Sequence, residues 1–134
     1  MEITRYLKLP FYFDSSPLRE ELKSFSDKNW IMHFNKRDYE GKWKCISLMG
    51  QPGHEESIIV THNNTLAQPS KYLSLLPSFQ SIIHSFQCPI ISARLMNLHV
   101  GAHIKPHCDN NMGYADGVIP VSYTHLTLPT TPYV

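Results

Sequence analysis

The triplet His107-Cys108-Asp109 carries the residue types with the clearest chemistry in this chain. On an extended strand, side chains two residues apart point to the same face, so His107 and Asp109 can aim at one point. An imidazole and a carboxylate are two of the three ligands in the 2-His-1-carboxylate triad. That triad holds non-haem Fe(II) and leaves positions open for oxygen and a cosubstrate. The triplet therefore predicts two metal ligands, although a His-x-Asp alone is common and needs support from its surroundings.

The segments on either side of the triplet predict a strand, a turn and a loop. Residues 88–100 are rich in Ile and Leu and predict one long strand, which Gly101-Ala102 interrupts. Pro106 removes a backbone donor directly before His107, which suits the end of a strand or the edge of a sheet. Residues 113–117 then have the composition of a turn. The two candidate ligands are thus expected just beyond a strand end.

Two helices are expected to cover the sheet. After Ser16-Pro17, where Ser16 can cap a helix and Pro17 fits its first turn, apolar residues recur at helical spacing up to Phe25. A second amphipathic helix is predicted over residues 77–86, where such an apolar stripe is typical of core packing. Aromatic and β-branched residues predict strands at 30–34, 42–49 and 58–61, with a turn at 38–41.

Several motifs in a fixed order resemble the aspartyl/asparaginyl β-hydroxylase family, over roughly residues 5–119. The central motifs are Arg94-Leu95 with Leu98, residues 101–109 around the triplet, and residues 112–117. The lead-in motifs are Leu9-Pro10, Phe13-Asp14, Trp30, His33-Phe34-Asn35 and residues 39–43. The resemblance implies an α+β fold with a double-stranded β-helix (jelly-roll or cupin-like) core. It also implies an Fe(II)- and 2-oxoglutarate-dependent dioxygenase, an oxidoreductase that uses molecular oxygen to hydroxylate an amino acid or a peptidyl side chain.

The resemblance also assigns roles to individual residues. It implies that His107 and Asp109 are catalytic and hold Fe(II), together with a third His ligand that cannot be identified here. It implies that Arg94 can hold the carboxylate of a small-molecule or peptide substrate, a contact that suits a guanidinium; the alternative is an Arg on the surface of a strand. His33, Asn35 and Trp43 are expected to be structural.

The composition excludes several partners. The chain has 134 residues, enough for one domain. Its 12 basic and 11 acidic residues give a net charge of +1, so we expect no nucleic-acid partner and no anionic membrane surface. We see no signal peptide and no apolar run of membrane-spanning length. Three widely spaced cysteines suit a reducing compartment, so the expected location is cytoplasmic.

The last residues differ from the rest of the sequence. Residues 120–134 carry no charged side chain, and Pro129 and Pro132 stop any strand or helix pattern. Residues 121–130 resemble a translated sequencing adapter, so we expect residues 1–119 to be the N-terminal part of a dioxygenase domain and 120–134 to be a non-native or disordered tail. On this interpretation the core is incomplete and the chain as given is inactive. His125 is then not expected to be the third ligand.

Three alternatives remain open at this stage. His99, His103 and His107 are four residues apart and could form a zinc-binding stripe on a helix. Gly101 and Pro106 disfavour a helix there, and on a strand His103 and His107 would be about 13 Å apart. The second alternative is a cupin-like metal-binding protein without turnover. The third is an incomplete fold whose exposed strand edges make it aggregate.

Overall fold

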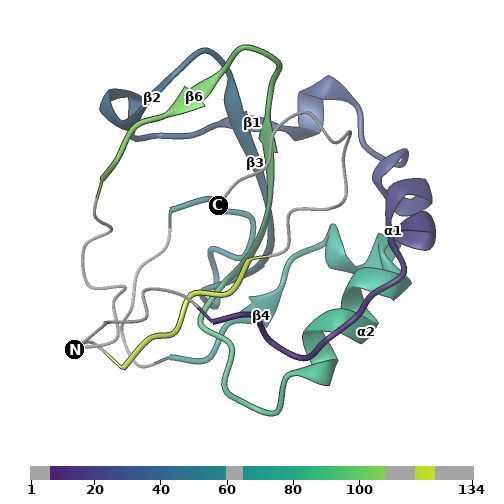
Figure 1. Ribbon diagram of the computed structural model, residues 1–134. Coiled ribbons are helices and arrows are strands. Elements are labelled where there is room, and N and C mark those ends of the chain that lie inside the picture. Colours follow the sequence, from purple (N-terminus) through teal and green to yellow (C-terminus); the bar gives the residue numbers. More distant parts are fainter. Residues whose placement is uncertain (1–6, 60–64, 108–116, 123–134) are drawn as a thin grey trace.

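The computed structural model describes residues 7–59, 65–107 and 117–122. It combines α-helices with antiparallel strands (Figure 1). The helices are α1 (Ser15–Leu22) and α2 (Pro77–Ser85), and short 3-10 turns cover Asp27–Asn29, Lys36–Asp38 and Leu73–Leu75. The strands are β1 (Ile31–Met32), β2 (Tyr39–Glu40), β3 (Trp43–Gly50), β4 (Gln68–Pro69), β5 (Ala93–Leu98) and β6 (His103–Ile104).

Strand β3 is the centre of the larger sheet. It pairs antiparallel with β5 along one edge, and with β1 and β4 along the other edge. Strands β2 and β6 pair antiparallel in a second, two-stranded sheet. The α+β class is therefore confirmed. Within the described part of the chain these strands form no closed barrel, and the double-stranded β-helix stays a prediction.

The two helices cover one face of the larger sheet, as Figure 1 shows for α1 and α2 beside β3 and β5. Alternate side chains of β3 and β5 point toward the helices and pack with them into one apolar core. This core consists of Leu18, Ile46, Leu48, Leu73, Leu76, Phe79 and Leu95, all at most 6% exposed. The helices thus act as the predicted cover of the sheet.

Both helices begin with a carboxylate that accepts backbone hydrogen bonds. Asp14, rather than the predicted Ser16, caps α1: its carboxylate accepts a hydrogen bond from the Ser16 backbone N–H at 3.0 Å. Helix α2 begins at Pro77 as predicted, and Glu21 of α1 accepts hydrogen bonds from the Ser78 N–H at 2.8 and 3.0 Å. A carboxylate suits both places because the first N–H groups of a helix have no partner within it.

Several predicted boundaries need correction. The strand over 30–34 is only Ile31–Met32, and the first helix ends at Leu22 instead of Phe25. The long strand over 88–100 is shorter, because only Ala93–Leu98 is in the ladder. Pro89 cannot donate to a ladder, and the Ile90 carbonyl instead accepts a hydrogen bond from Ala67 N–H at 3.0 Å. The turn over 38–41 contains β2, and residues 58–59 are not in a strand. The rest of the predicted strand at 58–61 lies outside the described residues.

The helices of the described residues are all short. None of them is long and apolar enough to cross a membrane.

Candidate metal and substrate site

The face of β3 that points away from the helices carries the candidate site. Trp43, Cys45 and Ser47 alternate with the core residues of β3 and therefore share this face. Their cross-strand partners on β5 are Leu98, Met96 and Arg94, respectively. Cys45 and Ser47 are at most 1% exposed, so this face is also covered. Aromatic, sulfur-containing and charged residues distinguish it from the aliphatic core on the helix side.

His107 is exposed and lies three residues beyond β6. Its Nδ1 is 2.8 Å from the backbone carbonyl oxygen of Lys105. A carbonyl oxygen can only accept, so Nδ1 carries the proton, and in the neutral ring Nε2 carries the lone pair. This is the arrangement found in metal-ligating histidines, whose second nitrogen donates to a carbonyl or a carboxylate. His107 thus fits the predicted role of a metal ligand.

The second predicted ligand, Asp109, and Cys108 and His125 lie outside the described residues. Among the residues that are described, no group of three or more His, Cys, Asp or Glu side chains could hold a metal ion. His103 of β6 is exposed and faces Glu40 of β2 in the ladder. The described residues therefore do not support the zinc stripe of histidines considered above.

A stack of aromatic rings lies beside His107. The Trp43 ring is 6.4 Å from the His107 ring, centroid to centroid. On β3 the same Trp43 stacks against His33, with centroids 3.8 Å apart and planes 3° apart. The Tyr39 hydroxyl donates to the His33 carbonyl at 2.8 Å and its ring meets both neighbours edge to face. Such contacts fix ring positions, so Trp43 forms a rigid wall next to His107.

His33 differs from His107 in its hydrogen bonding. The backbone N–H of Asn35 donates to Nδ1 of His33 at 3.2 Å, so this nitrogen carries a lone pair and not a proton. His33 is also only 6% exposed. These contacts agree with the structural role expected for His33 and Trp43.

The small sheet determines where His107 lies. Tyr39 pairs with Ile104 and Glu40 pairs with His103, and the Lys105 N–H extends this ladder by donating to the Asp38 carbonyl at 2.7 Å. Lys105 therefore contributes its N–H to the ladder and its carbonyl to His107. The sequence could not predict this role of Lys105, because the hydrogen bonds are made by backbone groups that nearly every residue type has.

Arg94 lies on the same sheet face as Trp43 but further along it. Arg94 lies four positions before Leu98, the partner of Trp43, which corresponds to about 13 Å along β5. The half-buried guanidinium donates from Nη1 to the Ile58 carbonyl at 3.1 Å. Among the described residues no carboxylate forms an ion pair with it. Arg94 is thus half-buried, and both its role in substrate binding and the alternative, an Arg on the surface of a strand, stay predictions.

The pKa of the Cys45 thiol depends on both its burial and the nearby Arg94 guanidinium. Burial raises the pKa of the Cys45 thiol, and the nearby Arg94 guanidinium opposes this only in part. A thiol with a raised pKa stays protonated and is a poor nucleophile or metal ligand. Cys45 is therefore a packing residue of this face.

The comparison with known families agrees with the motifs. The model of the aspartyl/asparaginyl β-hydroxylase family matches residues 14–132. The chain therefore belongs to this family of hydroxylases. Comparisons with curated proteins and with solved structures gave no match. The matched range continues beyond residue 119, and the predicted boundary between domain and tail at that point stays a prediction.

Proposed function

We propose that this protein is an Fe(II)- and 2-oxoglutarate-dependent dioxygenase that hydroxylates an amino acid or a peptidyl side chain. Membership of the hydroxylase family supports the reaction class. The observation that supports the assignment of the site is the Nδ1–H of His107, which donates to the Lys105 carbonyl as the second ring nitrogen of metal-ligating histidines does.

The chain's own residues would hold and shield the metal. Nε2 of His107 and a carboxylate oxygen of Asp109 are the proposed ligands, and a third His ligand is not assigned. The Trp43 indole, fixed by its stack on His33, forms an apolar wall beside His107. When bound, Fe(II) with 2-oxoglutarate and O₂ supplies the oxidation: 2-oxoglutarate gives succinate and CO₂, and one oxygen atom enters a C–H bond of the substrate.

Arg94 is the proposed contact for a substrate carboxylate. Its guanidinium has five N–H donors, and the Ile58 carbonyl uses one of the two Nη groups. A planar guanidinium can bind a carboxylate through two parallel hydrogen bonds, which favours a substrate with a free carboxylate or an acidic side chain. Replacement by Met should raise KM for the substrate at least about tenfold, as expected for loss of a charged hydrogen bond.

The test of the proposed function is succinate production by the full-length protein in the presence of Fe(II), ascorbate, O₂ and 2-oxoglutarate, with a panel of free amino acids and peptides. Substrate-dependent succinate should be lost in His107→Ala and Asp109→Ala. His103→Ala is the matched control, because His103 is a nearby exposed histidine of the same small sheet, and should retain turnover.

Normal turnover by His107→Ala would refute the assignment. Tight metal binding by the parent protein without any succinate would favour the non-catalytic, cupin-like alternative.

A further inference from the structure

The two sheets are parts of one bent pair of antiparallel segments, residues 39–50 and 93–104. Tyr39 pairs with Ile104 in the small sheet, and Trp43 pairs with Leu98 in the large sheet. Three residues lie between Tyr39 and Trp43, whereas five lie between Leu98 and Ile104, so the second segment holds two extra residues. The Ala102 N–H donates to the His99 carbonyl at 3.0 Å and closes these residues into a turn. Extra residues in one strand of an antiparallel pair bend the pair, as a β-bulge does.

A close contact between the two segments lies at the bend. Gly41 has φ +83°, and a Cβ built on it would lie 2.8 Å from Cα and 2.9 Å from Cβ of Ala102. Distances this short exclude any side chain at Gly41 unless the segments move apart, because the nearest atom belongs to the backbone. Gly41 is therefore needed both for its left-handed conformation and for the close approach of Ala102.

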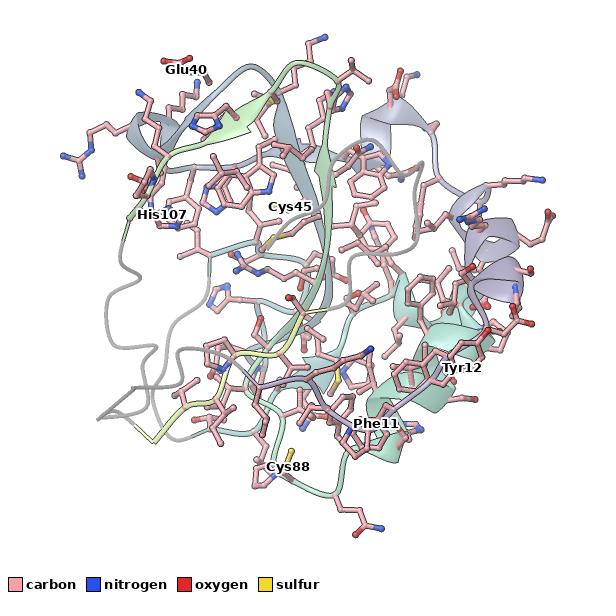
Figure 2. All side chains as sticks on the ribbon, in the orientation of Figure 1. Phe11, Tyr12, Glu40, Cys45, Cys88 and His107 are labelled. Atoms are coloured by element: carbon pink, nitrogen blue, oxygen red, sulfur yellow. The ribbon has the colours of Figure 1, made fainter. Side chains whose placement is uncertain are left out.

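The bend determines how His107 meets Trp43. If the two segments continued straight in this register, His107 would lie opposite residue 36, seven positions from Trp43, or about 23 Å away along the strand. The two ring centroids are instead 6.4 Å apart. The bend, together with the turn of the chain from Lys105 to His107, brings this end of the strand pair back toward Trp43. Figure 2 shows His107 beside the small sheet.

We propose that the contact between Gly41 and Ala102 positions His107 and thereby sets the metal affinity of the site. Gly41 and Ala102 are positioning residues in this proposal, which rests on the proposed role of His107 as a metal ligand. The contact acts through β6: a wider separation at Ala102 shifts the β2–β6 ladder, and with it the Lys105 carbonyl that holds the His107 ring.

The test is a Co(II) titration followed by tryptophan fluorescence in a Trp30→Phe background, so that Trp43 is the sole tryptophan. Co(II) replaces Fe(II) because it is stable in air. The midpoint reports metal affinity, and the amplitude reports the proximity of the metal to Trp43. In this background, Gly41→Ala should weaken Co(II) binding by about 10–100-fold, the usual effect of disturbing the support of a ligand.

Two further variants separate the contact from backbone strain. Gly53 has φ +86° with no atom within 4 Å of a built Cβ, so Gly53→Ala introduces the strain without the clash and should keep the midpoint within about twofold. Ala102→Val crowds Gly41 from the other side without a positive φ, and should weaken binding in the same direction as Gly41→Ala.

A folded Gly41→Ala with the parent midpoint would overturn the proposal, and so would an equal loss of affinity in Gly53→Ala. If Gly41→Ala loses its far-UV circular dichroism and is therefore unfolded, Ala102→Val becomes the test of the proposal. A Co(II) midpoint in Ala102→Val equal to that of the parent protein would then overturn the proposal. Loss of binding in His107→Ala, with a normal midpoint in the bend variants, would keep the metal site and reject only its positioning by the bend. Absence of Co(II) binding by the parent protein would overturn the metal site itself and this proposal with it.

Discussion

The two faces of the β3–β5 sheet differ in composition, although the side chains of Ile46 and Leu48 on one face and of Trp43 and Cys45 on the other are all buried. The helix side is aliphatic, with Ile46, Leu48 and Leu95 packed under α1 and α2. The opposite side holds Trp43, Cys45 and Arg94, and extends to His107 through the small sheet. Aliphatic burial contributes stability in proportion to area, whereas aromatic, charged and imidazole groups bind and orient ligands. The sheet therefore separates the aliphatic face that stabilises the fold from the face that is proposed to carry the chemistry.

The largest expected effect comes from the helix side. Ile46 is 1% exposed at the centre of β3, so Ile46→Ala should lower the free energy of unfolding by about 2–5 kcal/mol through lost burial and a cavity. Met96, 48% exposed on β5, is the control, and Met96→Ala should cost less than about 1 kcal/mol. Urea unfolding measures both. Equal losses would contradict the assignment of the core to one face.

The contact between the helices should have a smaller effect. Glu21→Gln removes the charge that accepts two hydrogen bonds from the Ser78 N–H, so we expect a loss of about 1–2 kcal/mol. Its neighbour Glu20 forms only an exposed ion pair with Lys23 at 2.8 Å, and Glu20→Gln should change the stability by less than about 1 kcal/mol. Thermal unfolding of the two variants makes this comparison, and the same Tm for both would show that Glu21 does not stabilise α2.

The reactivity of the cysteines tests how well the second face of the sheet is covered, without any change in stability. Cys45 is fully buried and its pKa is raised, whereas Cys88 is exposed. Iodoacetamide at pH 8 should therefore modify Cys88 readily and Cys45 only after denaturant is added. Peptide mapping by mass spectrometry distinguishes the two sites. Rapid modification of native Cys45 would contradict a tightly covered second face.

Local signals predicted the elements that depend on local sequence. The apolar stripe over 77–86 gave helix α2, and Gly101-Ala102 interrupted the strand as predicted, with Gly101 at φ +80°. The predictions were wrong where tertiary contacts determine the secondary structure. Tyr39 and Glu40 have the sequence of a turn, yet they pair with β6, a partner more than sixty residues away. No periodicity in the chain could show that pairing.

The candidate ligands were proposed from residue types, whereas the backbone contacts that hold His107 in place were not foreseen. His107 was singled out from its spacing to Asp109, and its hydrogen bond fits the expected role. The Lys105 carbonyl and the close contact of Gly41 with Ala102 depend on backbone atoms, and residue types do not reveal them. Asp109 stays a prediction, because it lies outside the described residues.

The most direct test of the central claim compares the two tryptophans in the presence of a paramagnetic metal. Trp30 packs with Phe25 next to the helix-side core, and Trp43 lies 6.4 Å from His107 on the other face. Titration with Mn(II), followed by NMR, should broaden the indole N–H signal of Trp43 far more than that of Trp30, and His107→Ala should remove the difference. Equal broadening of both signals, or persistence of the difference in His107→Ala, would contradict a metal site at His107.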